Sequence, residues 1–258
     1  DVNIETPALT QDYTIDFSGG NDKGKYYSSL GYYKSDGNAT GNWYKRFTWT
    51  FNADYKLKKW LTSSSSLNFS HNTWYGIVGG IDPANYFSRV FSVPPTFRGT
   101  NADGEWLIGV RGTGDANVKT YMDALERDNN TDKFTMTQAF TVDIIKGLSM
   151  KFSGSWYYED TKQEAFNHDY MTGVNRWYRD RYTSDYYNRT LNQTYNIIAT
   201  YNGSYKNHNL NAMAGFEYYD QNQKGFQAVG YGAPTDSFQD LNLTDPERRS
   251  MDSWHSQN

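Results

Sequence analysis

Hydrophobic and polar residues alternate with a period of two along several segments of the chain, and this pattern predicts half-buried β-strands. In residues 46–57, one face carries Phe47, Trp49, Phe51, Ala53, Tyr55 and Leu57. The other face carries Arg46, Thr48, Thr50, Asn52, Asp54 and Lys56. Successive side chains of a strand point to opposite sides, so we expect this strand to separate an apolar environment from a wet one.

The same alternation predicts eight strands along the chain. They are expected near residues 11–18, 25–35, 43–57, 61–74, 132–145, 150–158, 190–202 and 210–218. A further strand begins near Ser253. The fold class predicted from these elements is all-β and antiparallel.

The connections between these strands are short and long in turn. Short turns fall at residues 19–24, 58–60, 146–147 and 202–209, and the longer connections include residues 75–131, 161–185 and 219–250. The longest connection is expected to hold two short helices, one starting at Asp82 and Pro83 and one at Asp115. Outer-membrane barrels have short periplasmic turns and longer extracellular loops, so this sorting favours a transmembrane β-barrel.

The composition is compatible with a barrel. The chain has 258 residues, no Cys, 17% aromatic residues and a net charge of −4, and its mean hydropathy is −0.86. A membrane-spanning helix needs ~20 consecutive apolar residues, whereas a barrel strand needs an apolar residue only at every second position. No basic stripe indicates nucleic-acid binding, and the sequence points to no cofactor.

Aromatic residues gather near the predicted ends of the strands. Near the long connections lie Trp43, Tyr44, Trp74, Tyr75, Trp156, Tyr157, Tyr158, Tyr186, Tyr187, Tyr218 and Tyr219. Near the short turns lie Trp60, Tyr201 and Tyr205. Two such belts are typical of a barrel at the two membrane interfaces, although aromatics of a soluble sandwich or a sugar-binding platform are the alternative. The predicted lipid-facing residues include Phe47, Trp49, Phe51, Tyr195, Ile197 and Phe216.

Eight strands could close into a small barrel, but continuation into a larger one is favoured. An open sheet edge in hydrocarbon would leave backbone groups unpaired at a cost of several kcal/mol each, so the sheet must close or continue. Both ends of the chain read as cuts within a longer protein, and the strand near Ser253 is unfinished. We therefore expect an arc of a larger barrel wall.

Several strings of residues resemble the SusC/RagA family of TonB-dependent outer-membrane transporters. They are residues 17–22 (FSGGND) with Tyr26, Tyr27 and 29–32 (SLGY), then 125–133 (LERDNNTDK), 154–158 (GSWYY), 190–196 (TLNQTYN), 232–236 (GAPTD) and 252–255 (DSWH). These strings are similar to stretches of that family in the same order and extend over nearly the whole chain.

The resemblance implies a plugged barrel of ~22 strands, of which this chain would supply about a third. Residues 1–258 would then be part of one barrel domain, with the plug domain and the remaining strands outside this segment. The resemblance also implies the outer membrane of a Gram-negative bacterium, a SusD-like surface lipoprotein as a lid, and a TonB complex acting through other regions. The predicted function is uptake of oligosaccharides or peptides, without enzymatic activity.

Candidate chemistry in the sequence is sparse. His71, His168, His208 and His255 lack paired metal-ligand spacing. Glu159, Asp160 and Glu164 are expected to follow a strand end as part of a solvated surface. Gly109, Gly112 and Gly114, beside Arg111, are expected to belong to a flexible loop and not to a phosphate-binding loop. Asn188 and Asn192 are expected on the polar face of a strand.

The predicted ligand or partner contacts are the loop residues Trp106, Arg111, Trp177, Arg179 and Arg181, since rings stack on sugars and arginine offers planar donors. Packing of these loop residues against each other is the alternative.

Two other functions compete with transport. A secreted β-rich adhesin or carbohydrate-binding module would be soluble and monomeric without detergent. An extracellular glycosidase would need two carboxylates facing each other across a cleft, with Glu159 and Asp160 as candidates.

Overall fold

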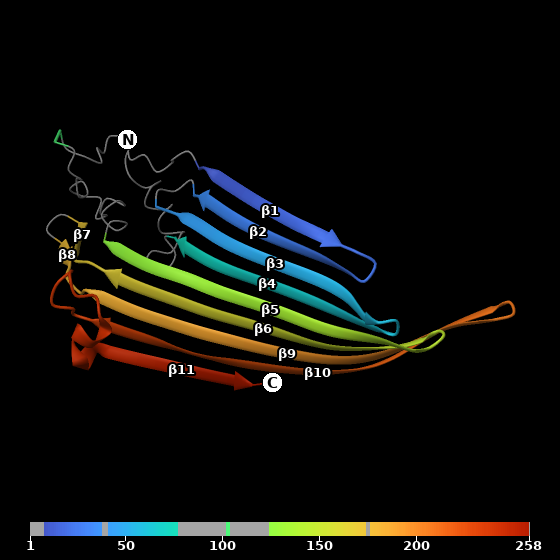
Figure 1. The fold of residues 1–258 in the computed structure, drawn as a ribbon. Helices are drawn as coiled ribbons and strands as arrows, with labels where there is room; N and C mark the ends of the chain where they lie inside the picture. The colour runs from blue at the N-terminus through green and yellow to red at the C-terminus, as the bar shows by residue number, and fades with distance from the viewer. Residues whose placement is uncertain (1–7, 38–40, 77–101, 104–123, 174–175, 258) are drawn as a thin grey trace.

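The computed structural model describes residues 8–37, 41–76, 102–103, 124–173 and 176–257. They form one antiparallel sheet of nine strands in the order β1-β2-β3-β4-β5-β6-β9-β10-β11, and a separate hairpin of β7 and β8. Each strand of the large sheet pairs with its nearest sheet neighbours in the sequence, and the strands lie side by side in Figure 1. The sheet described here is open, with β1 and β11 at its edges.

Within the large sheet, the strands lengthen from the hairpin β1-β2 through β3-β4 and β5-β6 to β9-β10. The strand bounds are β1 Thr10–Gly20, β2 Gly24–Asp36, β3 Trp43–Lys58, β4 Leu61–Tyr75, β5 Leu125–Ile145, β6 Leu148–Asn167, β7 Tyr170–Gly173, β8 Arg176–Tyr178, β9 Tyr182–Tyr205, β10 His208–Tyr231 and β11 Arg249–Gln257. Two short 3-10 turns, η1 Leu241–Leu243 and η2 Pro246–Arg248, connect β10 to β11. No helix among the described residues is long and apolar enough to cross a membrane.

The sorting of the connections is confirmed. The short turns of the hairpins β1-β2, β3-β4, β5-β6 and β9-β10 lie at one end of the sheet, and the longer connections lie at the other (Figure 1). Two of the short turns contain a left-handed residue, Gly147 at φ 87° and Lys206 at φ 52°. Such residues match the twist of tight hairpins. We call the end with the longer connections the outer end.

Several strands extend further toward the outer end than the alternation predicts. β5 begins at Leu125 instead of Asp132, β6 continues to Asn167, and β10 continues to Tyr231. As a result, the connections predicted at residues 161–185 and 219–250 are shorter, and Trp156 and Tyr218 lie inside strands rather than at strand ends. In these extensions both faces carry polar residues, so the sequence no longer alternates with a period of two. The backbone pairing nevertheless continues.

Other predictions have different outcomes. The strand expected near Ser253 is confirmed as β11, which starts at Arg249. The two helices expected within residues 75–131 fall mostly on residues outside the described ranges. The last part of that segment is described, and from Leu125 onward it forms β5.

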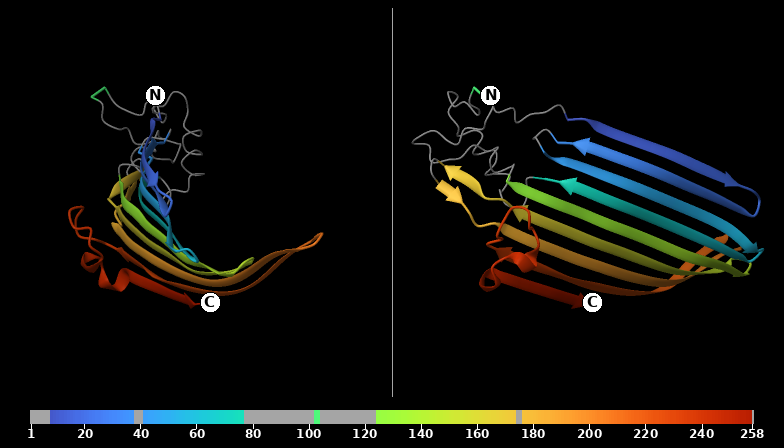
Figure 2. Two further views of the ribbon diagram at one scale, coloured as in Figure 1. Left: turned by 45° about the vertical axis from the view of Figure 1, so that its right-hand side comes forward. Right: turned by 60° about the vertical axis from the view of Figure 1, so that its left-hand side comes forward.

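The register gives the sheet two chemically different faces. One row across β1 to β9 consists of Ile15, Leu30, Trp49, Phe69, Phe134, Tyr158 and Leu191. A row on the opposite face, across β2 to β10, consists of Tyr27, Asn52, Ser66, Thr137, Ser155, Thr194 and Tyr219. We call these the apolar face and the polar face. The sheet curves strongly, as the end-on view in Figure 2 shows.

The apolar side chains on the apolar face remain exposed. Ile15 is 60% exposed and Phe216 is 68% exposed. Apolar side chains that are buried are mostly small, namely Ala124, Ala139, Phe166, Ala228 and Ala233. An apolar band runs along β3 from Phe47 to Leu57 and along β9 from Leu191 to Tyr201. This length fits the ~9 to 11 residues that a tilted strand needs to cross a bilayer.

The facing of β3 can be tested with two neighbouring substitutions. Phe51 lies near the middle of the apolar band, and Asn52 lies next to it on the polar face. We expect Phe51→Arg to lower the free energy of unfolding by ~2 to 4 kcal/mol because it places a cation in the bilayer, and Asn52→Arg to have a smaller effect. Denaturant titration of the lipid-reconstituted barrel measures both, and equal losses would contradict the facing.

Candidate functional site: the polar wall and the outer loops

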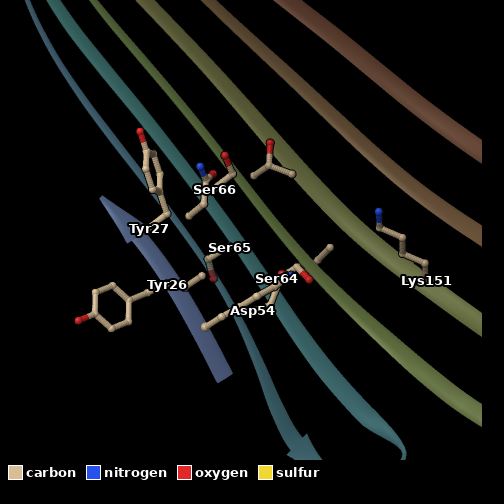
Figure 3. A pocket seen from close by; sticks show the side chains of 12 residues that line it. Tyr26, Tyr27, Asp54, Ser64, Ser65, Ser66 and Lys151 are labelled. Atoms are coloured by element: carbon tan, nitrogen blue, oxygen red, sulfur yellow. Dashed lines mark ion pairs between the residues drawn. The ribbon is translucent and has the colours of Figure 1, made fainter. Parts of the chain in front are cut away.

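The polar face forms a hollowed wall near the short turns. A hollow of about 480 Å³ lies on it and is lined by small hydroxyl groups of β4 and by charged groups on either side. Figure 3 shows Ser64 and Ser66 between Asp54 and Lys151, with Tyr27 at the margin. Lys25 Nζ lies 3.3 Å from Asp54 Oδ2. Small hydroxyl side chains leave room for other groups to approach the wall closely.

Further toward the outer end, the polar face is lined by amides and aromatic rings. Asn72 is buried; its Oδ1 accepts from the hydroxyl of Tyr44 (2.8 Å) and its Nδ2 donates to the carbonyl oxygen of Thr131 (3.2 Å). On the same face, Asn188 Oδ1 accepts from Gln223 Nε2 (3.0 Å) and from Trp254 Nε1 (3.1 Å). These contacts hold neutral donors and acceptors in fixed positions.

One aromatic pair and one ion pair complete this part of the wall. The rings of Tyr186 and Trp254 lie 5.6 Å apart between their centroids. Lys133 Nζ lies 2.7 Å from Glu159 Oε2, so these two charges on the polar face neutralise each other. The wall therefore offers a largely neutral surface of amides, hydroxyls and rings, which suits hydrogen bonding and stacking with uncharged polar molecules.

An ion-pair network anchors the β10–β11 connection to the outer ends of β5 and β6. Arg181 Nε donates to Asp236 Oδ1 (2.6 Å), and Arg181 Nη2 lies 3.1 Å from Asp169 Oδ2. His168 lies between Glu126 (Nε2 to Oε1, 2.5 Å) and Asp236 (Nδ1 to Oδ1, 3.5 Å). The hydrogen bond from Arg181 lowers the pKa of Asp236.

The carboxyl of Glu126 belongs to the same network. It accepts a hydrogen bond from Gln239 Nε2 (2.8 Å). This bond, together with the one from His168, lowers the pKa of Glu126. Farther along the connection, Arg248 binds Asp180 through two hydrogen bonds of 2.5 Å, and its guanidinium lies 5.2 Å from the ring of Tyr231.

A separate hollow of about 320 Å³ beside this network is acidic. Its lining includes Asp128, Glu164, Asp185 and Asp240. Burial raises the pKa of Asp185, and the charge of Glu164 raises it further. Within the described residues, no group of three or more metal-binding side chains is placed to hold a metal ion.

The loop residues predicted as ligand contacts have different surroundings. Trp106 and Arg111 lie outside the described residues. Trp177 is 51% exposed on the β7-β8 hairpin, and the Arg179 guanidinium lies 5.5 Å from its ring. Arg181 is occupied by Asp169 and Asp236. The structure thus brings Trp177 and Arg179 together but not Arg181, and ligand contact by these residues stays a prediction.

The carboxylates singled out in the sequence lie within β6, not after its end as predicted. Consecutive strand residues point to opposite faces, so Glu159 lies on the polar face and Asp160 on the apolar one. These two carboxylates cannot face each other across a cleft, as the glycosidase alternative requires.

The six residues predicted to face lipid share one face. Phe47, Trp49 and Phe51 of β3 and Tyr195 and Ile197 of β9 fall on the apolar face, and Phe216 of β10 lies opposite Ile197. Their contact with lipid stays a prediction. The amides of the polar wall were not singled out as ligand contacts, although the alternating Asn and Thr of residues 188–196 place them on one face.

Comparisons with known proteins identify the sheet. No family model matches the chain. Two proteins of Formosa agariphila are similar to it: TonB-dependent receptor P3 is 25% identical over 230 residues (86% of this chain, 22% of the relative), and TonB-dependent receptor P39 is 23% identical over 216 residues (83% and 20%). The RagAB peptide transporter superposes on 97% of this chain with a TM-score of 0.84 and 18% identity, covering 29% of the solved chain. The sheet has the same fold as part of that solved transporter chain, and its sequence is similar to TonB-dependent receptors.

The solved RagAB structures include a second state of the same assembly. The RagAB peptide importer in the "open-open" state superposes on 97% of this chain with a TM-score of 0.84 and 18% identity. The chain spans about a fifth of the length of the curated relatives it matches. The matches therefore concern only a part of each of these longer chains.

The network at Asp236 predicts how the β10–β11 connection responds to acid. A carboxyl with a lowered pKa stabilises the fold above its ordinary pKa of 3.8 and loses this contribution as the pH falls below that value. We expect amide hydrogen exchange of residues 232–240, corrected for the intrinsic rate, to be faster at pH 3 than at pH 7. Asp236→Asn should raise the exchange at pH 7, with residues 146–147 as an unchanged control. Unaltered exchange in the variant would contradict an anchoring role for Asp236.

Proposed function

We propose that this chain forms part of the wall of an outer-membrane importer that takes up oligosaccharides or peptides by a TonB-dependent mechanism. The observation that carries the proposal is the division of the sheet into an exposed apolar band and a polar wall, with the long connections at one end only. A barrel in lipid needs this arrangement. The similarity to TonB-dependent receptors supports the same class.

The polar wall is the proposed substrate surface. Its rings, at Tyr186 and Trp254, offer stacking surfaces to sugars or peptide groups, and the hydroxyls of Ser64 and Ser66 offer donors and acceptors. The buried amides of Asn72 and Asn188 hold neighbouring side chains of the wall in place. The paired Lys133 and Glu159 leave little net charge there. RagAB, whose barrel has the same fold, is a peptide transporter, which supports the peptide alternative without deciding against oligosaccharides.

The proposed partner on the outer side is a SusD-like surface lipoprotein. The β7-β8 hairpin and the β10–β11 connection lie at the outer end, where such a lid would sit. The ion pairs of Arg181 and Arg248 hold the β10–β11 connection in place, which suits a surface that binds a partner repeatedly. Contact with the TonB complex would be made by other regions of the whole protein.

A soluble adhesin or carbohydrate-binding module fits less well. Such a module must bury the apolar face of its sheet, whereas Ile15, Phe17 and Phe216 are more than half exposed. Large contiguous apolar surfaces of this kind indicate a membrane or an interface.

Substrate contact by the polar wall can be tested in cells that express the full transporter. Removal of one stacking ring costs ~0.5 to 1.5 kcal/mol, so we expect Trp254→Ala to reduce the initial rate of uptake of a radiolabelled substrate by about 2-fold to 10-fold. Trp60→Ala, in a short turn at the other end, is the matched control and should leave uptake unchanged. Normal uptake by Trp254→Ala at equal surface abundance would sink the assignment.

The energy source is tested separately. Deletion of TonB in the same cells should abolish uptake by the unaltered transporter while its amount in the outer membrane stays the same. Uptake that persists at the original rate without TonB would point to passive diffusion and would contradict the proposed mechanism, whatever the result for Trp254.

A further inference from the structure

Two cations lie directly opposite each other on the apolar face of β9 and β10. The register pairs Arg189 with Lys224, and both positions belong to the same face as Leu191 of the apolar band. Arg189 is half-buried and Lys224 is exposed. Like charges at directly opposed positions of neighbouring strands destabilise a sheet unless an anion lies between them.

The pair lies beyond the outer border of the apolar band. On β9 the band ends at Leu191, and Arg189 is the next position of that face; on β10 it ends at Tyr218, and Asp220 and Asn222 lie between it and Lys224. On the other side of the cations, the rings of Tyr187 and Phe226 pack 5.8 Å apart between their centroids. Aromatic rings on the outward face of a barrel gather at the level of lipid headgroups, so the two cations lie at that level too.

Neither cation has an ion-pair partner within the part of the chain that the structure describes. Asp160 lies opposite Arg189 on β6, but its Oδ2 accepts hydrogen bonds from the hydroxyls of Tyr158 (2.9 Å) and Tyr187 (2.8 Å) instead. On the far side of Lys224, His255 is engaged by Asn222 (3.2 Å). The carboxylate of Asp160 is therefore the only acidic group directly opposite either cation among the described residues, and it forms no ion pair with Arg189.

A second pair of opposed cations, Lys34 of β2 and Lys45 of β3, provides a contrast. It also lies just beyond the apolar band, past Tyr32 and Phe47. Here, however, Lys34 Nζ lies 3.3 Å from Asp36 Oδ2, and Lys45 Nζ lies 4.5 Å from the centroid of the Trp43 ring. The protein itself satisfies these two cations, so this pair does not need an outside partner.

We propose that Arg189 and Lys224 bind the phosphate group of a membrane lipid headgroup in the outer leaflet. Arginine presents a planar pair of donors that matches phosphate oxygens, and lysine adds a point charge. The lipid's acyl chains would lie along the apolar band below, which continues from Leu191, and its headgroup would lie against Tyr187 and Phe226. Continuity with this band favours a lipid over a soluble anion.

The proposal can be tested with the full transporter in detergent micelles. The probe is bisphosphorylated lipid A carrying a fluorophore, and its affinity is measured by fluorescence anisotropy at low salt. We expect Arg189→Gln or Lys224→Gln each to weaken binding about 5-fold, and the double variant to weaken it about 25-fold. The matched control is the Lys34→Gln, Lys45→Gln double variant, which removes the same charge at the same border and should change the affinity less than 2-fold.

Two further measurements separate the sources of phosphate. Dephosphorylated lipid A should bind the unaltered protein and the Arg189→Gln, Lys224→Gln variant equally, and millimolar inorganic phosphate should not displace the labelled lipid. Displacement by inorganic phosphate would overturn the proposal in favour of a soluble-anion site. Equal affinities of the unaltered protein and this double variant, or an equal loss in the control, would also overturn it. Thermal unfolding of each variant without lipid checks that the barrel remains folded.

Discussion

The constraint on which the structure depends is that every backbone N–H and C=O group in hydrocarbon must find a partner within the protein. In this chain each strand of the large sheet meets that need by pairing with its neighbours in the sequence, over a register that extends up to 24 residues between β9 and β10. The order of these strands across the sheet is therefore the same as their order along the chain. The two edge strands, β1 and β11, are the places where the sheet of the described residues leaves this constraint unmet.

Backbone pairing also explains why so little apolar surface is buried inside the protein. A sheet that is held by hydrogen bonds and surrounded by lipid can leave Ile15, Phe17 and Phe216 exposed without a soluble core beneath them. The opposite face is free to carry polar groups, and these satisfy one another: Thr137 and Ser155 hydroxyls lie 2.9 Å apart, and Lys133 pairs with Glu159. Polar contacts and exposed apolar side chains therefore occupy opposite faces of the same strands.

The sequence predicts the membrane portion of this fold well and the outer portion poorly, for a physical reason. Where one face is apolar and the other polar, as at Phe47 to Leu57, the residues alternate with a period of two, so the strands and their facing can be read from the sequence. Farther toward the outer end that pattern ends; Leu125 to Thr131 and Asp220 to Tyr231 pair as strands without the alternation. The partners of individual side chains are harder still to predict from the sequence. Arg181 resembles a ligand contact there, but the fold pairs it with Asp169 and with Asp236, and no sequence pattern marks either pairing.

The two ends of the sheet differ in what fixes them, and this difference bears on function. At the short turns, two-residue connections with left-handed Gly147 and Lys206 fix the hairpins mainly by backbone geometry. At the outer end, paired strands extend beyond the apolar band, and side-chain ion pairs such as Arg248 with Asp180 set the path of the β10–β11 connection. These side-chain contacts lie in the connections and not within the strand ladder, so they can change between relatives while the paired strands are kept. The outer end is therefore where a shared barrel wall can acquire different ligands and partners while the membrane portion stays the same.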